Sequence, residues 1–177
     1  FVSSGLAAEE RRRFEIDARQ RGSFQHEVLA RFHEELRAAG LSWREVTPEE
    51  ARARLGRIAG EAVGAYGDGL FQADDASLFS ARSLTQALQN FIEVILGWMR
   101  SSYGFDPHAV ELAFGVGDAS LPAWHVDLGD GCALALHGKI DRVDIAIDPG
   151  QHQVLCVIVD YKSGARQVDP LLLACGA

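Results

Sequence analysis

The chain has 177 residues, 47% of them hydrophobic, which is enough for one ordinary core and excludes several independent domains. Acidic residues outnumber basic ones by 25 to 17, and the net charge of -8 argues against a broad basic surface that would grip a phosphate backbone along its length. No apolar run approaches the ~20 residues that span a bilayer, so we expect no membrane partner. The three widely spaced cysteines fit neither a disulfide framework nor a paired zinc motif, so we expect a cytoplasmic protein.

Three helices are predicted in the first half of the chain. Apolar residues recur at helical spacing from Phe24 to Leu36, which predicts a helix over 25–39 that ends at Gly40. The run Thr-Pro-Glu-Glu at 47–50 combines a capping box with proline at the first helical position, so a second helix should run to about residue 63. A third apolar repeat predicts a helix from after Ser80 to about residue 103.

Strands are predicted from Pro107 onward, where alternating and β-branched residues replace the helical pattern. We place them at roughly 109–116, 123–128, 132–147 with a break near Gly138, and 153–162. Cys132 and Cys156 fall in apolar strand segments and are expected to be buried. This order of elements predicts an α+β fold with a central mixed β-sheet flanked by α-helices.

The whole chain is predicted to be one domain, with a helical half at 1–105, a sheet half at 106–164 and a truncated tail at 165–177. It begins with Phe1 and ends on the apolar run Leu-Leu-Leu-Ala-Cys-Gly-Ala. We therefore expect it to be a piece of a longer protein.

The last two strands are predicted to form a hairpin that brings two aspartates together. Asp148-Pro149-Gly150 is a turn signal, and a four-residue loop at 149–152 would pair Asp148 with Gln153. In an antiparallel ladder paired positions keep a constant sum, so Asp141 should face Asp160. Three apolar pairs share their predicted face, which we expect to be a buried stripe: Ile147 with Val154, Ile145 with Cys156, and Val143 with Ile158.

Opposed carboxylates on a half-buried face repel each other unless a cation or a proton lies between them. Oxygen ligands with open positions suit Mg²⁺, and Lys162, on the same predicted face, could orient or deprotonate an attacking water. The pattern therefore indicates metal-dependent hydrolysis of a phosphodiester. An ordinary set of salt bridges at a strand end is the alternative interpretation of the same residues.

The hairpin also carries the motif by which the chain resembles a known family. Gly-Lys-Ile-Asp-Arg-Val-Asp at 138–144 and Val-Asp-Tyr-Lys-Ser-Gly at 159–164 are similar to the nuclease signature of the RecB-like branch of the PD-(D/E)XK superfamily. The likeness is greatest to the C-terminal nuclease domains of AddB-type helicase-nuclease subunits. The segment from Gly22 through His26 to Leu36 resembles the helix that precedes this signature, so the resemblance spans 22–164.

The resemblance implies a restriction-endonuclease-like core and a set of site residues. It makes His26, Asp141 and Asp160 ligands of Mg²⁺ or Mn²⁺, adds the backbone carbonyl of Tyr161 as an oxygen ligand, and makes Lys162 the catalytic lysine. At the first strand, Glu111 matches a glutamate often seen upstream of the signature; an exposed strand glutamate is the equal alternative.

The chain departs from the family in two places. The segment 168–177 lacks the Gln-Leu-x-x-Tyr pattern that helps relatives of this branch to bind the DNA backbone. Some AddB-type domains hold an iron-sulfur cluster through one cysteine before the histidine helix and three after the lysine, whereas this chain has only Cys175 after residue 162 and none before 132. We expect no iron-sulfur cluster in this chain.

The expected function is a Mg²⁺-dependent deoxyribonuclease of the exonuclease type in DNA repair or recombination. Its partners would be single-stranded DNA or duplex ends and a helicase subunit or fused helicase domain. One alternative is a non-catalytic nuclease-like module that structures a helicase-nuclease complex, which the charge of -8 favours. A hydrolase of small phosphoesters is a third interpretation, although the sequence shows no glycine-rich phosphate cradle.

Overall fold

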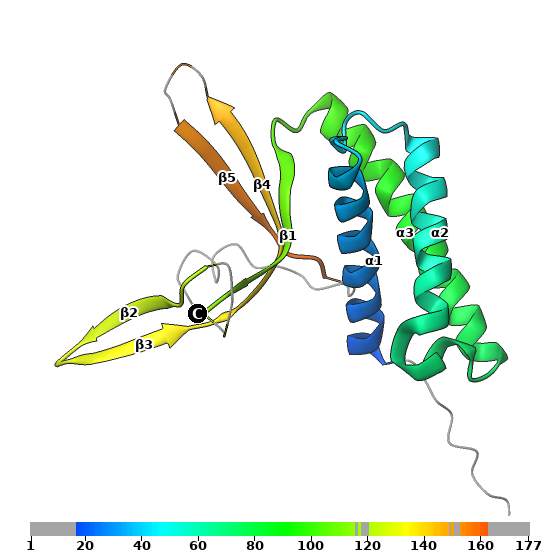
Figure 1. Cartoon of the computed structure of the whole chain (residues 1–177), viewed down its shortest axis with the longest axis horizontal. Coiled ribbons are helices and arrows are strands. Elements are labelled where there is room, and N and C mark those ends of the chain that lie inside the picture. The colour runs from blue at the N-terminus through cyan, green and yellow to red at the C-terminus, as the bar shows by residue number, and fades with distance from the viewer. Residues whose placement is uncertain (1–16, 116, 118–120, 149, 151–152, 163–177) are drawn as a thin grey trace, which may run out of the picture.

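The computed structural model of the protein describes residues 17–115, 117, 121–148, 150 and 153–162, so the predicted tail at 165–177 lies outside the described residues. Helices come first in the chain and strands follow (Figure 1), which confirms the predicted α+β class. The helical elements are α1 (Ala18–Ala38), α2 (Pro48–Ala65), the short 3₁₀ helix η1 (Tyr66–Gln72) and α3 (Asp75–Ser101). The strands are β1 (Asp106–Phe114), β2 (Trp124–Gly129), β3 (Cys132–Leu136), β4 (Gly138–Asp148) and β5 (Gln153–Val159).

Side-chain caps determine where the helices begin. Thr47 and Glu50 form the predicted capping box at the start of α2, and Asp17 forms a second one with Gln20 that starts α1 earlier than the apolar pattern indicated. Asp74 accepts a hydrogen bond from the Ser77 N–H at 2.7 Å, so α3 also begins before the predicted boundary. Each predicted helix exists, and the polar caps rather than the apolar repeats fix its first residue.

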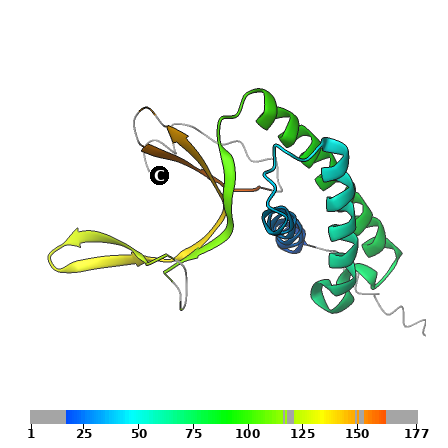
Figure 2. The ribbon, with the colours of Figure 1, turned by 45° about the horizontal axis from the view of Figure 1, so that its top comes forward.

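The hydrophobic core lies among the helices. Phe24 and Phe32 of α1 are fully buried, as are Leu55 of α2, Phe71 of η1 and Ile92 of α3. Both views place α1 between the sheet and the other two helices (Figures 1 and 2). None of the described helices combines the length and apolar character needed to cross a membrane.

The described strands form two antiparallel arrangements. A three-stranded sheet has the order β1-β4-β5, while β2 and β3 form a separate hairpin that projects away from the helices (Figure 2). The β4–β5 register is the predicted one, with Asp148 opposite Gln153 and Arg142 opposite Val159, so positions keep their constant sum along the ladder. The fourth predicted strand ends at Val159, which leaves Asp160 and Lys162 just beyond it.

The prediction of which sheet face is buried was wrong. Arg142 and Asp144 of β4 are buried, whereas the predicted apolar stripe is open, with Ile147 at 72% and Val154 and Ile158 at 65% exposure. Because side chains alternate across a strand, the buried charged pair and the apolar stripe occupy opposite faces, and the helices cover the charged one. Cys132 and Cys156 are likewise exposed and unpaired rather than buried.

Candidate metal centre

Three side chains from three different elements converge beside the end of β5. His26 comes from α1, Glu111 from β1 and Asp141 from β4, and one ligand atom of each lies within 4.8 Å of the others. His26 Nδ1 is 3.3 Å from Asp141 Oδ1 and 3.5 Å from Glu111 Oε1. The three side chains are 26%, 12% and 24% exposed, in the order His26, Asp141, Glu111, so the cluster is partly buried but open to solvent.

The two carboxylates meet because of the strand register. Val110 pairs with Arg142 and Leu112 with Ile140, which sets Glu111 opposite Asp141 across β1 and β4. Glu111 has φ of 50°, a left-handed conformation that is uncommon for a residue with a side chain. Such strain persists where the surrounding structure enforces it and is concentrated at functional sites.

The imidazole of His26 reaches the cluster from the edge of the helical core. Phe24 and Val28, two residues before and after it on α1, are fully buried and hold this turn of the helix in place. His26 Nε2 lies 3.3 Å from the carbonyl oxygen of Tyr161, which can accept a hydrogen bond from it. With the proton on Nε2, the Nδ1 lone pair faces the two carboxylates.

The main chain of Tyr161 contacts two members of the cluster. Its N–H donates to Asp141 Oδ2 at 2.7 Å, while its carbonyl faces His26. In this structure the Tyr161 carbonyl therefore lies against the ring nitrogen of His26 that points away from the carboxylates. A hydrogen bond of this kind to a metal-binding histidine fixes the tautomer and orientation of the ring.

Asp160 and Lys162 form a pair of their own. Lys162 Nζ lies 2.9 Å from Asp160 Oδ1 and 2.8 Å from Oδ2, and both side chains are more than half exposed. The carboxylate of Asp160 is not among the three groups that lie within 4.8 Å of one another. The structure thus brings the upstream glutamate, Glu111, to His26 and Asp141 and turns Asp160 toward Lys162.

The side chain of Tyr161 is partly buried and lies beside a buried ion pair. Arg142 Nη1 donates to the Tyr161 hydroxyl at 2.8 Å, and Arg142 Nε lies 2.8 Å from Asp144 Oδ1. Burial raises the pKa of Tyr161 to about 12. The pKa of Tyr103, whose hydroxyl donates to Asp144 Oδ2, is also raised to about 12, first by burial and then by that hydrogen bond.

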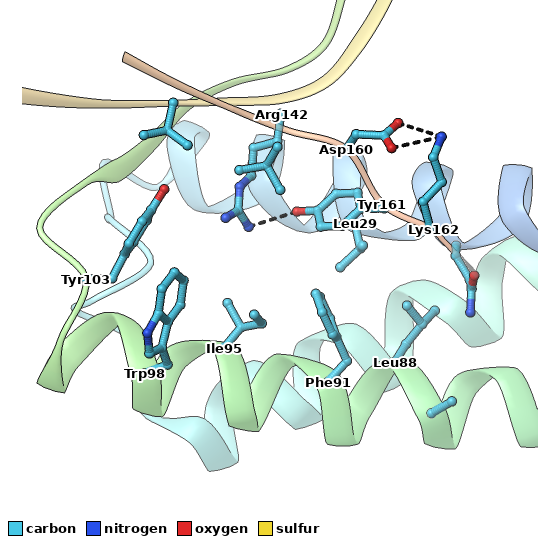
Figure 3. Close-up of a pocket in the computed structure, with 14 residues that line it drawn as sticks. Leu29, Leu88, Phe91, Ile95, Trp98, Tyr103, Arg142, Asp160, Tyr161 and Lys162 are labelled. Carbon is cyan, nitrogen blue, oxygen red and sulfur yellow. Dashed lines mark hydrogen bonds and ion pairs between the residues drawn. The ribbon is translucent and has the colours of Figure 1, made fainter. Parts of the chain in front are cut away.

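A cavity of about 600 Å³ adjoins this region (Figure 3). Phe91, Ile95 and Trp98 of α3 form one wall, and Asp160 and Lys162 lie at its rim. Its lining is mainly apolar, so it does not offer the convergent oxygen atoms of a cation site. The ligand chemistry is concentrated instead at the cluster of His26, Glu111 and Asp141.

The residues of the cluster fit a divalent cation. One imidazole and two carboxylates supply nitrogen and hard oxygen donors within reach of a single ion, a set that Mg²⁺ and Mn²⁺ accept. Two carboxylates at this spacing repel each other, and within the described structure Lys139 offsets part of that repulsion, because its Nζ forms an ion pair with Glu111 Oε2. A bound cation would relieve the remainder.

Two features of the site are not apparent from the sequence interpretation. Lys139 and the Arg142–Asp144 pair lie within the signature motif, yet the motif alone assigns them no role. An arginine and an aspartate two residues apart in an apolar strand share one face, and this was the available signal for a paired, buried charge. The sequence also supports Glu111 less strongly than Asp160 as a metal ligand, because no short turn joins β1 to β4 and fixes the register of the two strands.

Comparison with known proteins assigns the chain to a family. The model of the PD-(D/E)XK nuclease superfamily matches residues 1–172. The chain is similar to a subunit of the ATP-dependent helicase/deoxyribonuclease of Moorella thermoacetica, with 32% identity over 96% of the chain, and to the proteins of the same name from Pelotomaculum thermopropionicum, with 34% over 93%, and Bacillus velezensis, with 34% over 96%. It spans 14% of the length of each of these relatives. The chain belongs to the PD-(D/E)XK nuclease superfamily.

Proposed function

We propose that the chain is a metal-dependent deoxyribonuclease domain that hydrolyses phosphodiester bonds, in an exonuclease-type activity of DNA repair or recombination. The observation that carries this proposal is the convergence of His26, Glu111 and Asp141 in a chain of this superfamily. Carboxylates from two strands and an imidazole from a helix lie close enough together to share one ion. A divalent cation gives their juxtaposition a chemical use.

In this proposal His26, Glu111 and Asp141 hold Mg²⁺ or Mn²⁺. Asp160 is the further carboxylate that the family resemblance implicates; the Tyr161 carbonyl, which the resemblance also implicates, faces His26 Nε2 and orients that ligand. When bound, the cation would lower the pKa of a coordinated water and withdraw charge from the phosphate. Lys162 would orient or deprotonate the attacking water, and Asp160 holds its ammonium at 2.8 Å.

The proposed substrate is single-stranded DNA or a duplex end, and the proposed partner is a helicase subunit or a helicase domain of the same chain. The names of the relatives, which join a helicase to a deoxyribonuclease, support this assignment. Because the chain has a net charge of -8, another part of the assembly would supply most of the basic surface that binds the DNA backbone. The exposed, unpaired Cys132 and Cys156 suit the reducing cytoplasm.

The test is cleavage of an end-labelled single-stranded oligonucleotide with Mg²⁺, with Mn²⁺ and with excess chelator. Metal-dependent cleavage by the wild-type chain, reduced by at least about 100-fold in Lys162→Ala, is the expected result for a lost proton-transfer group. Arg57→Ala removes an exposed cation that pairs with glutamates on α1 and α2, and it should cleave like the wild type. Undiminished cleavage by Lys162→Ala contradicts the assignment.

A second candidate function is a non-catalytic, nuclease-like module. The observation that favours it is that the site supplies its own cations: Lys139 pairs with Glu111 and Lys162 with Asp160. A ligand that binds only the folded state must raise stability. A melting temperature that is the same with and without saturating amounts of either metal, together with no cleavage, supports this second function over the first.

A further inference from the structure

A charged pair in the middle of β4 is almost completely removed from solvent. The side chains of Arg142 and Asp144 are 2% and 0% exposed, and they form a two-point contact, with Nε 2.8 Å from Oδ1 and Nη2 2.9 Å from Oδ2. Removing two charges from water costs about as much as their attraction returns, and apolar residues of similar volume often serve stability equally well. A contribution to stability alone therefore does not explain why a charged pair occupies this buried position.

The pair is connected to the metal cluster through the side chain of Tyr161. Arg142 donates to the Tyr161 hydroxyl at 2.8 Å and its guanidinium lies 5.6 Å from the centre of that ring (Figure 3). The same ring meets Phe91 of α3 and the imidazole of His26 edge to face, each at 5.9 Å between centres. Contacts on several sides thus hold the ring, and the arginine holds its hydroxyl.

The backbone of Tyr161 then transmits this position to the ligands. Its N–H binds Asp141 Oδ2 at 2.7 Å and its carbonyl lies 3.3 Å from His26 Nε2. Tyr161 follows the end of β5, so the strand ladder does not fix these two groups. Whatever fixes the side chain of Tyr161 therefore also fixes the orientation of two of the three metal-binding residues.

We propose that the buried Arg142–Asp144 ion pair is a positioning device for the metal centre and acts through Tyr161, whose backbone orients Asp141 and His26. Arg142, Asp144 and Tyr161 are positioning residues in this scheme, because their side chains do not enter the ligand set. The inference rests on the proposed metal site. It adds that the site is preformed by a buried charge network before any metal arrives.

Tyr161→Phe is the informative variant, because it keeps the ring and its packing and removes only the hydroxyl that Arg142 binds. We expect its dissociation constant for Mn²⁺, measured from the electron paramagnetic resonance signal of free Mn²⁺, to rise on the order of tenfold, the lower end of the effect of losing a partner outside the ligand set. In the metal-free protein, the Tyr161 amide proton should shift upfield in the ¹H–¹⁵N spectrum as its bond to Asp141 weakens.

Two further variants separate positioning from general destabilisation. Thr85→Val is the control, because it also removes one hydroxyl, which donates at 2.9 Å to the Ala81 carbonyl on α3, and Thr85 does not line the cavity that contains His26 and Glu111. It should leave Mn²⁺ affinity unchanged. Tyr103→Phe removes the hydroxyl that binds Asp144 at 2.9 Å and should weaken Mn²⁺ binding by a smaller factor than Tyr161→Phe, because it lies one contact further from the ligands.

The outcomes distinguish this inference from the function on which it rests. Wild-type protein that binds no Mn²⁺ overturns both the metal site and its positioning. Wild-type binding combined with unchanged Mn²⁺ affinity and an unshifted Tyr161 amide in Tyr161→Phe overturns the positioning role alone. Should Tyr161→Phe fail to fold, Tyr103→Phe decides in its place: weaker Mn²⁺ binding supports the proposal, and wild-type affinity refutes it.

Discussion

The ammonium of Lys139 forms an ion pair with the carboxylate of Glu111, so the chain itself places a positive charge at the edge of the candidate metal centre. The ammonium and a divalent ion compete for the same carboxylate and also repel each other. Lys139→Met keeps the length of the side chain and removes its charge. We expect Mn²⁺ affinity to rise about two- to fivefold, the range of an exposed ion pair worth up to ~1 kcal/mol.

The control for Lys139→Met is Arg57→Met, which makes the same change in net charge on α2, where the arginine pairs with Glu35 and Glu61. Isothermal titration of the two variants at matched ionic strength separates a local effect from a general one. Equal affinities in Lys139→Met and the wild type would show that Lys139 does not compete for the metal site.

The positive φ of Glu111 leads to an unusual order of stabilities. A protein with glycine inside a strand is ordinarily less stable than one with alanine there. At φ of 50°, however, glycine avoids the ~1–2 kcal/mol that a side chain costs in the left-handed region. Glu111→Gly should therefore unfold in urea with a free energy about 1 kcal/mol higher than Glu111→Ala, although both lack the carboxylate. At Val154, exposed on β5 and free of positive φ, the glycine variant should be the less stable one.

The buried pair on β4 predicts a large penalty for a single substitution and a small one for a double. Asp144→Ala leaves the guanidinium of Arg142 buried without its partner and should lower the free energy of unfolding by about 3–5 kcal/mol. Arg142→Met combined with Asp144→Leu fills the same space without charge and should recover most of that loss. The positioning role predicts that this stable double variant still binds Mn²⁺ weakly, which calorimetry on the folded protein would check.

His33 is expected to make the fold less stable in mild acid. It is buried on α1 and accepts a hydrogen bond from Trp43 Nε1 at 3.2 Å, and burial lowers its pKa below the ordinary 6.5. Because the unfolded chain takes up this proton at a higher pH than the folded one, stability is complete above pH 6.5 and falls as the pH drops below it. Urea unfolding about one pH unit above and one below that value should show this loss.

His33→Asn provides the comparison, because its amide oxygen can accept the Trp43 hydrogen bond and does not titrate. The variant should lose less stability than the wild type between the two pH values. Parallel pH dependence in the two proteins would contradict a depressed pKa at His33.

Local patterns were sufficient to predict the three long helices and the strands of this fold, but not the 3₁₀ helix η1. The capping box at Thr47 marked the start of α2, and the turn at Asp148 set a register that the β4–β5 ladder follows pair by pair. These features depend on residues within a few positions of one another. The burial of each face does not, because it depends on which side of the sheet the helices cover.

The candidate site could be predicted only in part for the same reason. Asp141 and His26 were identified from motif residues, and the structure brings them together. The proximity of Glu111 required the β1–β4 register, which joins strands separated by the β2–β3 hairpin and has no turn to define it. The sequence shows that Arg142 and Asp144 share one strand face, but their enclosure depends on Trp43 and Tyr161, whose positions the motif does not give.

The outward face of the β4–β5 hairpin has a consequence for handling the protein. Ile147, Val154 and Ile158 form an apolar strip there that none of the described residues covers. Where nothing else covers it, copies of the chain associate through this strip as their concentration rises, as exposed apolar patches and strand edges generally do. Apparent metal affinities and cleavage rates would then depend on protein concentration, and light scattering across a dilution series would reveal the range in which they describe single molecules.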